Sequence, residues 1–187
     1  MSRRYVYVLR SDRPSGKSYG GFRWPGSGPV EAPDWNDRAE CGGGLHGLLW
    51  GCGYAGMLSD PSSSETRWRV VKVAAADVID LGGKVKFPRG EVVYFGDRDG
   101  ALALLDRRGA SDKPVVYAAR TAGDYGTATA GYYGTATAGD YGIIQIKRWN
   151  VSRYRIVTGY IGEDGLLPNV AYRLDDAGRF VRKDGAA

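Results

Sequence analysis

An eight-residue repeat constrains the fold of this chain more than any other feature. Residues 123–130 read Gly-Asp-Tyr-Gly-Thr-Ala-Thr-Ala, and residues 131–138 repeat this unit with Tyr in place of Asp. A third unit begins at residues 139–142, where Ile-Ile-Gln-Ile follows instead of Thr-Ala-Thr-Ala. Alternating Thr and Ala suit a short strand with threonines on one face and small alanines on the other. The pattern predicts a β-solenoid, a tight meander or, as a third alternative, a disordered linker.

The repeat supports one functional hypothesis and one structural one. A Thr-x-Thr array can order water or ice when many coils present it on a flat face, but this chain has only two complete units. The structural interpretation is a spacer or a small β-layer, capped by the Ile-rich third unit because stacked repeats need caps. We favour the structural interpretation. Tyrosines that recur every eight residues indicate packing rather than solvation: Tyr125, Tyr133 and Tyr141.

Glycine is abundant enough to limit the length of regular elements along the whole chain. Of 187 residues 29 are Gly, while 43% are hydrophobic and 25% charged, which is typical of a folded protein without long helices. One helix is expected at about residues 97–108, with Asp97 as its N-cap and Gly109 after its end. We therefore expect an α+β fold, mainly β, with short antiparallel strands. Its predicted parts are an N-terminal α+β module (1–120), the octapeptide β-repeat (121–142) and a C-terminal antiparallel β segment packing on the rest (143–187).

Hydropathy, charge and cysteine content exclude several classes of protein. No apolar stretch approaches the roughly 20 residues that span a bilayer, and the basic start lacks the apolar region of a secretory signal. We therefore expect a cytoplasmic location and no membrane partner. The net charge of +5 is spread along the chain, as on a solvated surface. Cys41 and Cys52 are the only cysteines, which excludes a disulfide framework and suggests two free thiols.

The segment 40–47 holds the densest group of reactive side chains. It contains Cys41 and His46, the only histidine, around a run of three glycines. A nucleophilic cysteine needs a nearby base, and His46 is the only imidazole available. A structural zinc needs four ligands, which this segment and Cys52 do not supply, so we expect no metal and no cofactor. We favour a structural loop in which His46 is hydrogen-bonded; the alternative is a binding or catalytic pocket.

A second group of residues combines basic and aromatic side chains in a predicted hairpin at 147–155. Such side chains suit single-stranded nucleic acid, through phosphate contacts and base stacking. An ordinary amphipathic hairpin explains them equally well. The residues that carry the nucleic-acid alternative are Trp149, Arg153, Tyr154 and Arg155.

Several of these segments together resemble a family of small phage and prophage proteins of unknown function. They are Gly-Gly-Phe-Arg-Trp-Pro at 20–25, Cys-Gly-Gly-Gly-Leu-His at 41–46, the stretch 80–90, the Gly-Thr-Ala-Thr-Ala repeats and the segment 159–165. In such proteins a Cys-Gly-x-Gly-Leu-His module precedes a variable number of glycine-rich repeats. The repeats alone also resemble the Ala-Gly-Tyr-Gly-Ser-Thr-x-Thr units of bacterial ice-nucleation proteins. This chain has far fewer units, so their function is not implied.

The phage resemblance implies a non-enzymatic protein that binds a host macromolecule in the host cytoplasm. An inhibitor of host defence, such as an anti-CRISPR protein, is one example, and the expected partner is a host protein or complex. The first alternative is a small enzyme with a pocket of His46 and Cys41 near Phe22 and Trp24, acting on a nucleotide-like substrate. The second is single-stranded nucleic-acid binding through the 147–155 hairpin. Exposed aromatic and arginine side chains are the expected binding residues: Phe22, Trp24, Trp35, Trp149, Arg153, Tyr154 and Arg155.

Overall fold

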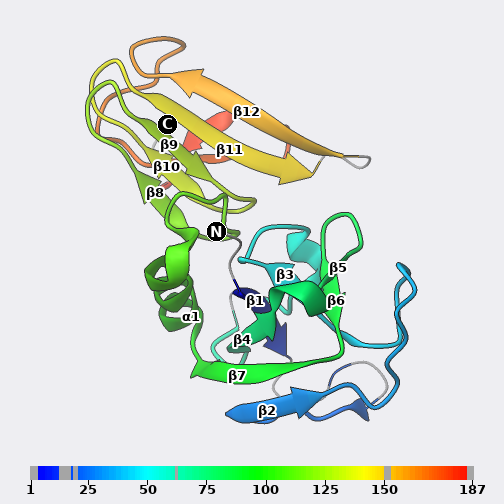
Figure 1. Ribbon diagram of the computed structural model, residues 1–187. Helices are drawn as coiled ribbons and strands as arrows, with labels where there is room; N and C mark the ends of the chain where they lie inside the picture. The colour runs from blue at the N-terminus through cyan, green and yellow to red at the C-terminus, as the bar shows by residue number, and fades with distance from the viewer. Residues whose placement is uncertain (1–3, 13–17, 19–20, 62, 150–152, 185–187) are drawn as a thin grey trace. The chain divides into compact units, whose positions relative to one another are not determined.

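The chain forms two compact units in a computed structural model, Met1–Ser111 and Asp112–Ala187. The structure describes residues 4–12, 18, 21–61, 63–149 and 153–184. Strands dominate both units, and α1 is the single α-helix of the described residues (Figure 1). The expectation of a mainly β fold with one clear helix is confirmed.

Unit 1 is built around a seven-stranded sheet with the order β2-β7-β4-β1-β3-β6-β5. All neighbouring strands in it are antiparallel. The strands are β1 (Tyr5–Asp12), β2 (Gly28–Glu31), β3 (Leu45–Leu49), β4 (Arg67–Ala74), β5 (Ile79–Asp80), β6 (Val85–Phe87) and β7 (Arg89–Gly96). Short 3₁₀ turns occupy Ala55–Met57 and Ala75–Asp77. The β-branched and aromatic residues of the central strands form the main core of this unit, which includes Val8, Val71, Val73, Val85 and Phe87.

Helix α1 (Arg98–Leu105) begins where the sequence predicts it. The Asp97 side chain accepts a hydrogen bond from the Gly100 N–H at 2.7 Å, which satisfies one of the free amides of the first turn. A π-type turn, Asp106–Ala110, continues the helix. Gly109 lies within that turn with φ 104°, a left-handed conformation that favours glycine. The two sequence signals that predicted the helix therefore act at its two ends.

Unit 2 is a two-coil β-solenoid with a cap of additional strands. Its strands are β8 (Ala119–Thr121), β9 (Thr127–Ala130), β10 (Thr135–Thr137), β11 (Ile143–Trp149), β12 (Tyr154–Tyr160), β13 (Tyr172–Leu174) and β14 (Phe180–Arg182). They form a three-stranded sheet, β12-β11-β9, and a four-stranded sheet, β14-β13-β10-β8. Strand β10 pairs in parallel with β8, and β11 pairs in parallel with β9 (Figure 1).

The register of these parallel pairs defines the coil. Ala119 lies opposite Thr135, and Thr127 lies opposite Ile143, so one coil takes 16 residues and contains two octapeptides. Successive octapeptides thus alternate between the two sheets. Of the three alternatives left open by the sequence, the solenoid is the one the structure shows.

The solenoid begins before the recognisable repeat and ends beyond it. Residues 115–122 lie one coil below 131–138 although they lack the glycines of the repeat. After the second coil, β12 pairs antiparallel with β11 and β13 pairs antiparallel with β10. The division between units therefore falls at Ser111, not at residue 120, and the repeat and the C-terminal strands belong to one unit.

Candidate functional site

A recurring four-residue turn positions the strands of the solenoid. In each turn the second glycine donates to the carbonyl of the first, as Gly142 N–H does to Gly139 O at 3.1 Å. The tyrosine before that second glycine has a positive φ in every case, for example 55° at Tyr141. Positive φ at this place is typical of turns that otherwise select Gly or Asn. Tyrosine, not glycine, therefore occupies the left-handed position of these turns.

The glycines of the repeat serve a different purpose, because they allow one coil to lie close to the next. A Cβ placed on Gly142 would lie 2.6 Å from the Ala138 Cβ and 3.2 Å from the Gly126 carbonyl oxygen of the coil below. A Cβ on Gly134 would lie 2.5 Å from the Ala118 carbonyl oxygen. Such distances are too short for real side chains. Close contacts within or between coils thus account for the glycines of the repeat other than Gly123.

The tyrosines of the turns stack one coil apart. Tyr125 and Tyr141 are parallel to within 12°, with ring centroids 5.4 Å apart, and Tyr117 and Tyr133 form a second stack at 5.5 Å. The rings remain largely exposed, 78% at Tyr125 and 73% at Tyr141. The eight-residue spacing seen in the sequence therefore produces two stacks with a 16-residue spacing.

Small side chains fill the inside of the solenoid. The alanines of the Thr-Ala-Thr-Ala strands are fully or almost fully buried, and two isoleucines take their place in the second coil. Their small volume lets the two sheets pack closely. The buried members are Ala128, Ala130, Ala136, Ala138, Ile144 and Ile146.

The outer face of the three-stranded sheet carries an uncharged array of hydroxyl, amide and methyl groups. Thr129 of β9, Gln145 of β11 and Thr158 of β12 lie side by side across the three strands. The Thr129 hydroxyl donates to the Gln145 side-chain oxygen at 3.0 Å. Thr127 begins a second such row, which continues through Ile143 to Tyr160. We call these two rows the threonine face.

The outer face of the four-stranded sheet differs in charge. Thr135 and Thr137 project outward from β10, beside Ala119 and Thr121 of β8. On β13 the outward residue next to the buried Tyr172 is Arg173, which is exposed. The two rows of the threonine face therefore carry no charged side chain, although the next row of the same sheet contains Lys147 opposite Ile156.

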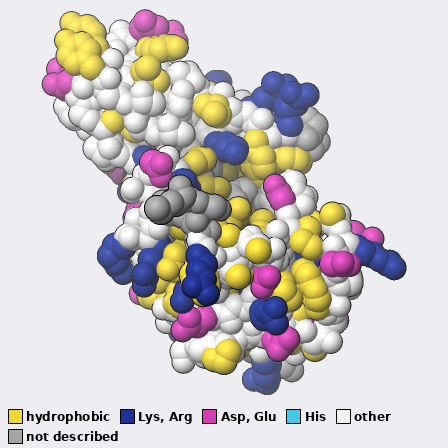
Figure 2. Space-filling view, in the orientation of Figure 1, with side chains coloured by type: hydrophobic (Ala, Val, Ile, Leu, Met, Phe, Trp, Pro, Cys, Tyr) yellow, Lys and Arg dark blue, Asp and Glu magenta, His cyan; other side chains and the backbone are white. Residues whose placement is uncertain are grey.

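The basic and aromatic hairpin predicted at 147–155 is formed by β11 and β12. Trp149 and Tyr154 lie opposite each other with an edge-to-face contact of 5.0 Å, and the Lys147 ammonium lies 4.9 Å from the Tyr154 ring. Arg153 and Arg155 are exposed. Figure 2 shows Lys and Arg side chains over much of the visible face among Asp and Glu, with the largest group of them at the upper right.

Unit 1 places four of the predicted site residues around one cavity. Phe22, Trp24, Cys41 and His46 line a space of about 800 Å³. Trp35 is not among its described lining residues; it is half-buried and packs against the core of the unit. Among the described residues no group of three or more His, Cys, Asp or Glu side chains could hold a metal ion. The described helices also include none long and apolar enough to cross a membrane.

His46 is hydrogen-bonded to the backbone of Gly44, but its Nε2 atom is buried and has no partner among the described residues. Burial, and then the positive charges of Lys84, Lys86 and Arg10, lower the pKa of this imidazole. His46 is therefore neutral at pH 7. The expectation that the histidine is held in place by hydrogen bonding is met at one ring nitrogen and not at the other.

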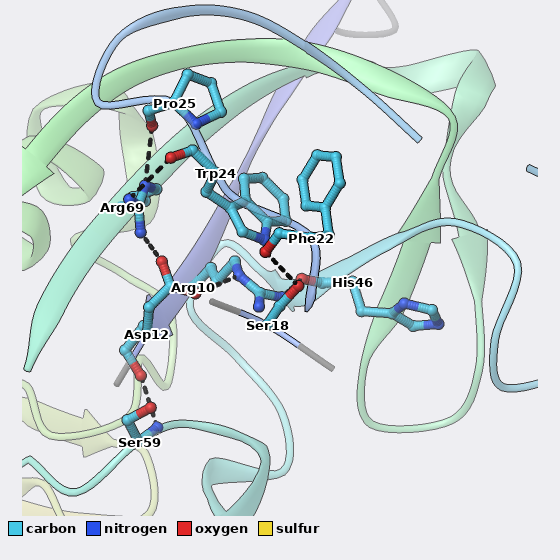
Figure 3. Close-up of polar contacts among 10 residues, drawn as sticks. Arg10, Asp12, Ser18, Phe22, Trp24, Pro25, His46, Ser59 and Arg69 are labelled. Carbon is cyan, nitrogen blue, oxygen red and sulfur yellow. Dashed lines mark hydrogen bonds and ion pairs between the residues drawn. The ribbon is translucent and has the colours of Figure 1, made fainter. Parts of the chain in front are cut away.

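A buried group of charges supports the wall of this cavity (Figure 3). Asp12 accepts from Arg10 Nε at 2.9 Å and forms an ion pair with Arg69. Arg69 also donates to the carbonyl oxygens of Trp24 and Pro25. The Arg10 guanidinium lies 4.4 Å from the Trp24 ring. These contacts fix both the backbone and the ring of Trp24, while burial lowers the pKa of Arg10 to about 10.

The fold of unit 2 is that of a small β-solenoid, and the curated relatives that the chain matches are ice nucleation proteins. The whole chain was compared, and it is 43% identical over 105 residues to an ice nucleation protein of Pseudomonas syringae; the match covers 55% of this chain and 9% of that protein. It is 34% identical over 116 residues to one of Xanthomonas campestris pv. translucens, covering 61% of this chain and 7% of that protein. The ice nucleation protein InaU of Pantoea ananas is 35% identical over 102 residues, covering 54% and 10%.

The chain spans about a tenth or less of the length of these relatives. No protein-family model matches it, and no solved structure matches it. The aligned 105 residues are far more than the octapeptides between residues 115 and 146, so the similarity does not rest on the repeats alone. The resemblance of the repeats to ice-nucleation units is thus confirmed, whereas the resemblance to phage proteins gains no support.

The relatives contradict the function expected from the sequence. A phage-type protein that binds a host macromolecule, or inhibits host defence, is wrong, and so is its enzyme alternative. Single-stranded nucleic-acid binding through the 147–155 hairpin stays a prediction. The cytoplasmic location conflicts with relatives that are ice nucleation proteins and is wrong as well. The expectation followed the phage resemblance and set the ice-nucleation resemblance aside because the chain has few repeat units, whereas the similarity to ice nucleation proteins extends over 105 residues. The binding residues chosen from the sequence remain untested predictions.

Proposed function

We propose that unit 2 is an ice-binding β-solenoid module and that it orders water on the threonine face. The observation that carries this proposal is the parallel register of the coils, which aligns Thr129 with Gln145 and, through β12, with Thr158. The ice nucleation proteins to which the chain is similar are named for activity on ice, which supports the proposal independently.

The geometry suits a surface that fixes water molecules in a regular pattern. Alternate residues of a strand lie roughly 6.8 Å apart, and neighbouring strands lie about 4.8 Å apart. A threonine offers a hydroxyl that bonds to water and a methyl group that does not. Because backbone pairing holds the strands, these groups keep their spacing without an ordering cost when water binds. The face carries no charge in its two rows, so it imposes no ionic hydration shell of its own.

The small width of the threonine face limits how strongly we expect one chain to act on ice. Only β9 has the complete Thr-x-Thr pattern on this sheet, and β11 and β12 extend the face with Gln145 and Thr158. A plane three strands wide orders few water molecules. We therefore expect one chain to adsorb to existing ice rather than to start freezing of bulk water at high temperature.

Partition into slowly grown ice tests the proposal on the intact chain. Thr129→Lys places a flexible charge in the middle of the threonine face. Thr137→Lys is the matched control, because Thr137 has the same place in its octapeptide and lies on the other sheet. We expect wild type and Thr137→Lys to enrich in ice and Thr129→Lys to be excluded, with unchanged circular dichroism in all three. Exclusion of the wild type, or equal enrichment of both variants, would overturn the proposal.

A further inference from the structure

The cavity of unit 1 has features that the solenoid does not use. We propose that it binds a small aromatic anion, with Phe22 and Trp24 against the ring and Lys84 at the anionic group. This inference concerns unit 1 and does not depend on ice binding by unit 2.

The wall of the cavity is aromatic and rigid. Phe22 and Trp24 meet edge to face, with centroids 5.7 Å apart and planes at 88°. Trp24 is only 6% exposed, and Arg10 and Arg69 hold its ring and backbone in place. Figure 3 shows the two rings side by side, with the His46 imidazole extending away from the buried ion pairs. Preformed aromatic walls of this kind suit a flat ligand.

The charged residues that line the cavity favour an anion. Two cations, Arg10 and Lys84, and one acid, the exposed Asp34, are among the described lining residues. Two Arg10 donors are already engaged, because its Nε donates to Asp12 and its Nη1 donates to the His46 carbonyl at 3.1 Å; Asp12 also pairs with Arg69, so this group of charges remains positive overall. Lys84 is half-buried, and its ammonium lies 2.7 Å from the Cys41 sulfur. A thiol is a weak acceptor, so this ammonium retains donors for a ligand.

Two buried nitrogen atoms at the cavity have no partner among the described residues: Trp24 Nε1 and His46 Nε2. Buried polar groups in proteins are nearly always hydrogen-bonded, and exceptions call for an explanation. An anionic ligand would accept a hydrogen bond from the Trp24 N–H. The neutral His46 can present Nε2 to a ligand without adding charge. The cavity volume of about 800 Å³ lies within the range of roughly 300–1,000 Å³ that small-molecule sites occupy.

A pair of fluorescent probes separates the contribution of the aromatic rings to binding from the contribution of the anionic group. 1-Anilinonaphthalene-8-sulfonate has two aromatic groups and a sulfonate, whereas N-phenyl-1-naphthylamine is the same amine without the sulfonate. We expect saturable binding of the sulfonate probe to the folded full chain, and weaker binding of the neutral probe. Lys84→Gln is expected to lower the affinity for the sulfonate probe by roughly tenfold and to leave the neutral probe unchanged. Lys183→Gln removes an exposed lysine of unit 2 and is the matched control.

The single histidine locates the binding site. Because His46 is the only histidine, its Cε1–H proton gives one resonance, which we expect to shift on addition of the sulfonate probe. Phe22→Ala should weaken both probes. Binding that does not saturate, an affinity that does not change in Lys84→Gln, or an unmoved His46 resonance would each overturn the proposal.

Discussion

Replacement of Gly139 by alanine tests the stacking of the two coils. A Cβ at this position would lie against the Asp124 carboxylate, 2.7 Å from the Asp124 backbone nitrogen and 2.9 Å from the Gly123 carbonyl carbon. Two of these atoms belong to backbone of the coil below, which cannot move away without a shift of the coil. The same contact region includes the hydrogen bond from the Asp140 N–H to Asp124 at 2.9 Å.

The expected cost of Gly139→Ala is about 2–4 kcal/mol of unfolding free energy. Overpacking of this kind costs about 1–3 kcal/mol, and a weakened hydrogen bond adds about 1 kcal/mol. Gly123 has the same place in the repeat, one coil earlier, but a Cβ there would meet no described atom within 4 Å. Gly123→Ala is therefore expected to change stability by no more than about 0.5 kcal/mol.

Urea unfolding of the two variants, followed by far-ultraviolet circular dichroism, measures this difference. The structure requires Gly139→Ala to lower the midpoint clearly and Gly123→Ala to leave it near that of the wild type. Equal urea midpoints for the two variants would refute the 16-residue coil. If every octapeptide had equivalent neighbours instead, Gly123 and Gly139 would have the same surroundings and the two substitutions would have the same effect.

Three further predictions concern other parts of the chain. Asp12→Ala leaves Arg10 and Arg69 buried without their carboxylate, and we expect a loss of about 3–5 kcal/mol in urea unfolding; Glu40→Gln, at an exposed ion pair, should change stability by less than about 0.5 kcal/mol. The pKa of His46 is lowered in the folded state, so the unfolded chain binds the proton more readily. Stability should therefore fall as the pH drops below about 6.5; in His46→Gln this part of the pH dependence of urea unfolding should be absent. At Tyr141, with φ 55°, Gly should be tolerated better than Ala by about 1 kcal/mol, and the reverse order of thermal midpoints would contradict the assigned turn.

Local signals in the sequence were sufficient for some elements. Asp97 and Gly109 predicted the helix because an N-cap carboxylate and a left-handed glycine act within one turn of the residues they terminate. The octapeptide predicted short strands for the same reason. The 16-residue coil was not visible, because identical octapeptides carry no mark that assigns alternate units to opposite sheets. Residues 115–122 were missed because they lack the glycines by which the repeat is recognised in the sequence.

The cavity of unit 1 shows the same limit at long range. Cys41 and His46 drew attention because they are close in sequence and chemically reactive. Lys84, whose ammonium contacts Cys41 across 43 residues of sequence, could not be connected to them without the pairing of β3 with β6. Arg10 reaches the same site from β1, where its charge looked like that of any surface residue. The residues that line the cavity of unit 1 are therefore brought together by long-range pairing of strands, which local sequence patterns do not reveal.

The most direct test of the account is the freezing temperature of water droplets as a function of the number of coils. Inserting additional copies of residues 123–138 adds one whole coil each time and extends the threonine face by one strand. We expect the freezing temperature to rise with every added coil, and to stay at the buffer value when the inserted threonines equivalent to Thr129 are lysines. A freezing temperature that does not depend on coil number, in chains that retain their β circular dichroism, would contradict an ice-ordering role for this face.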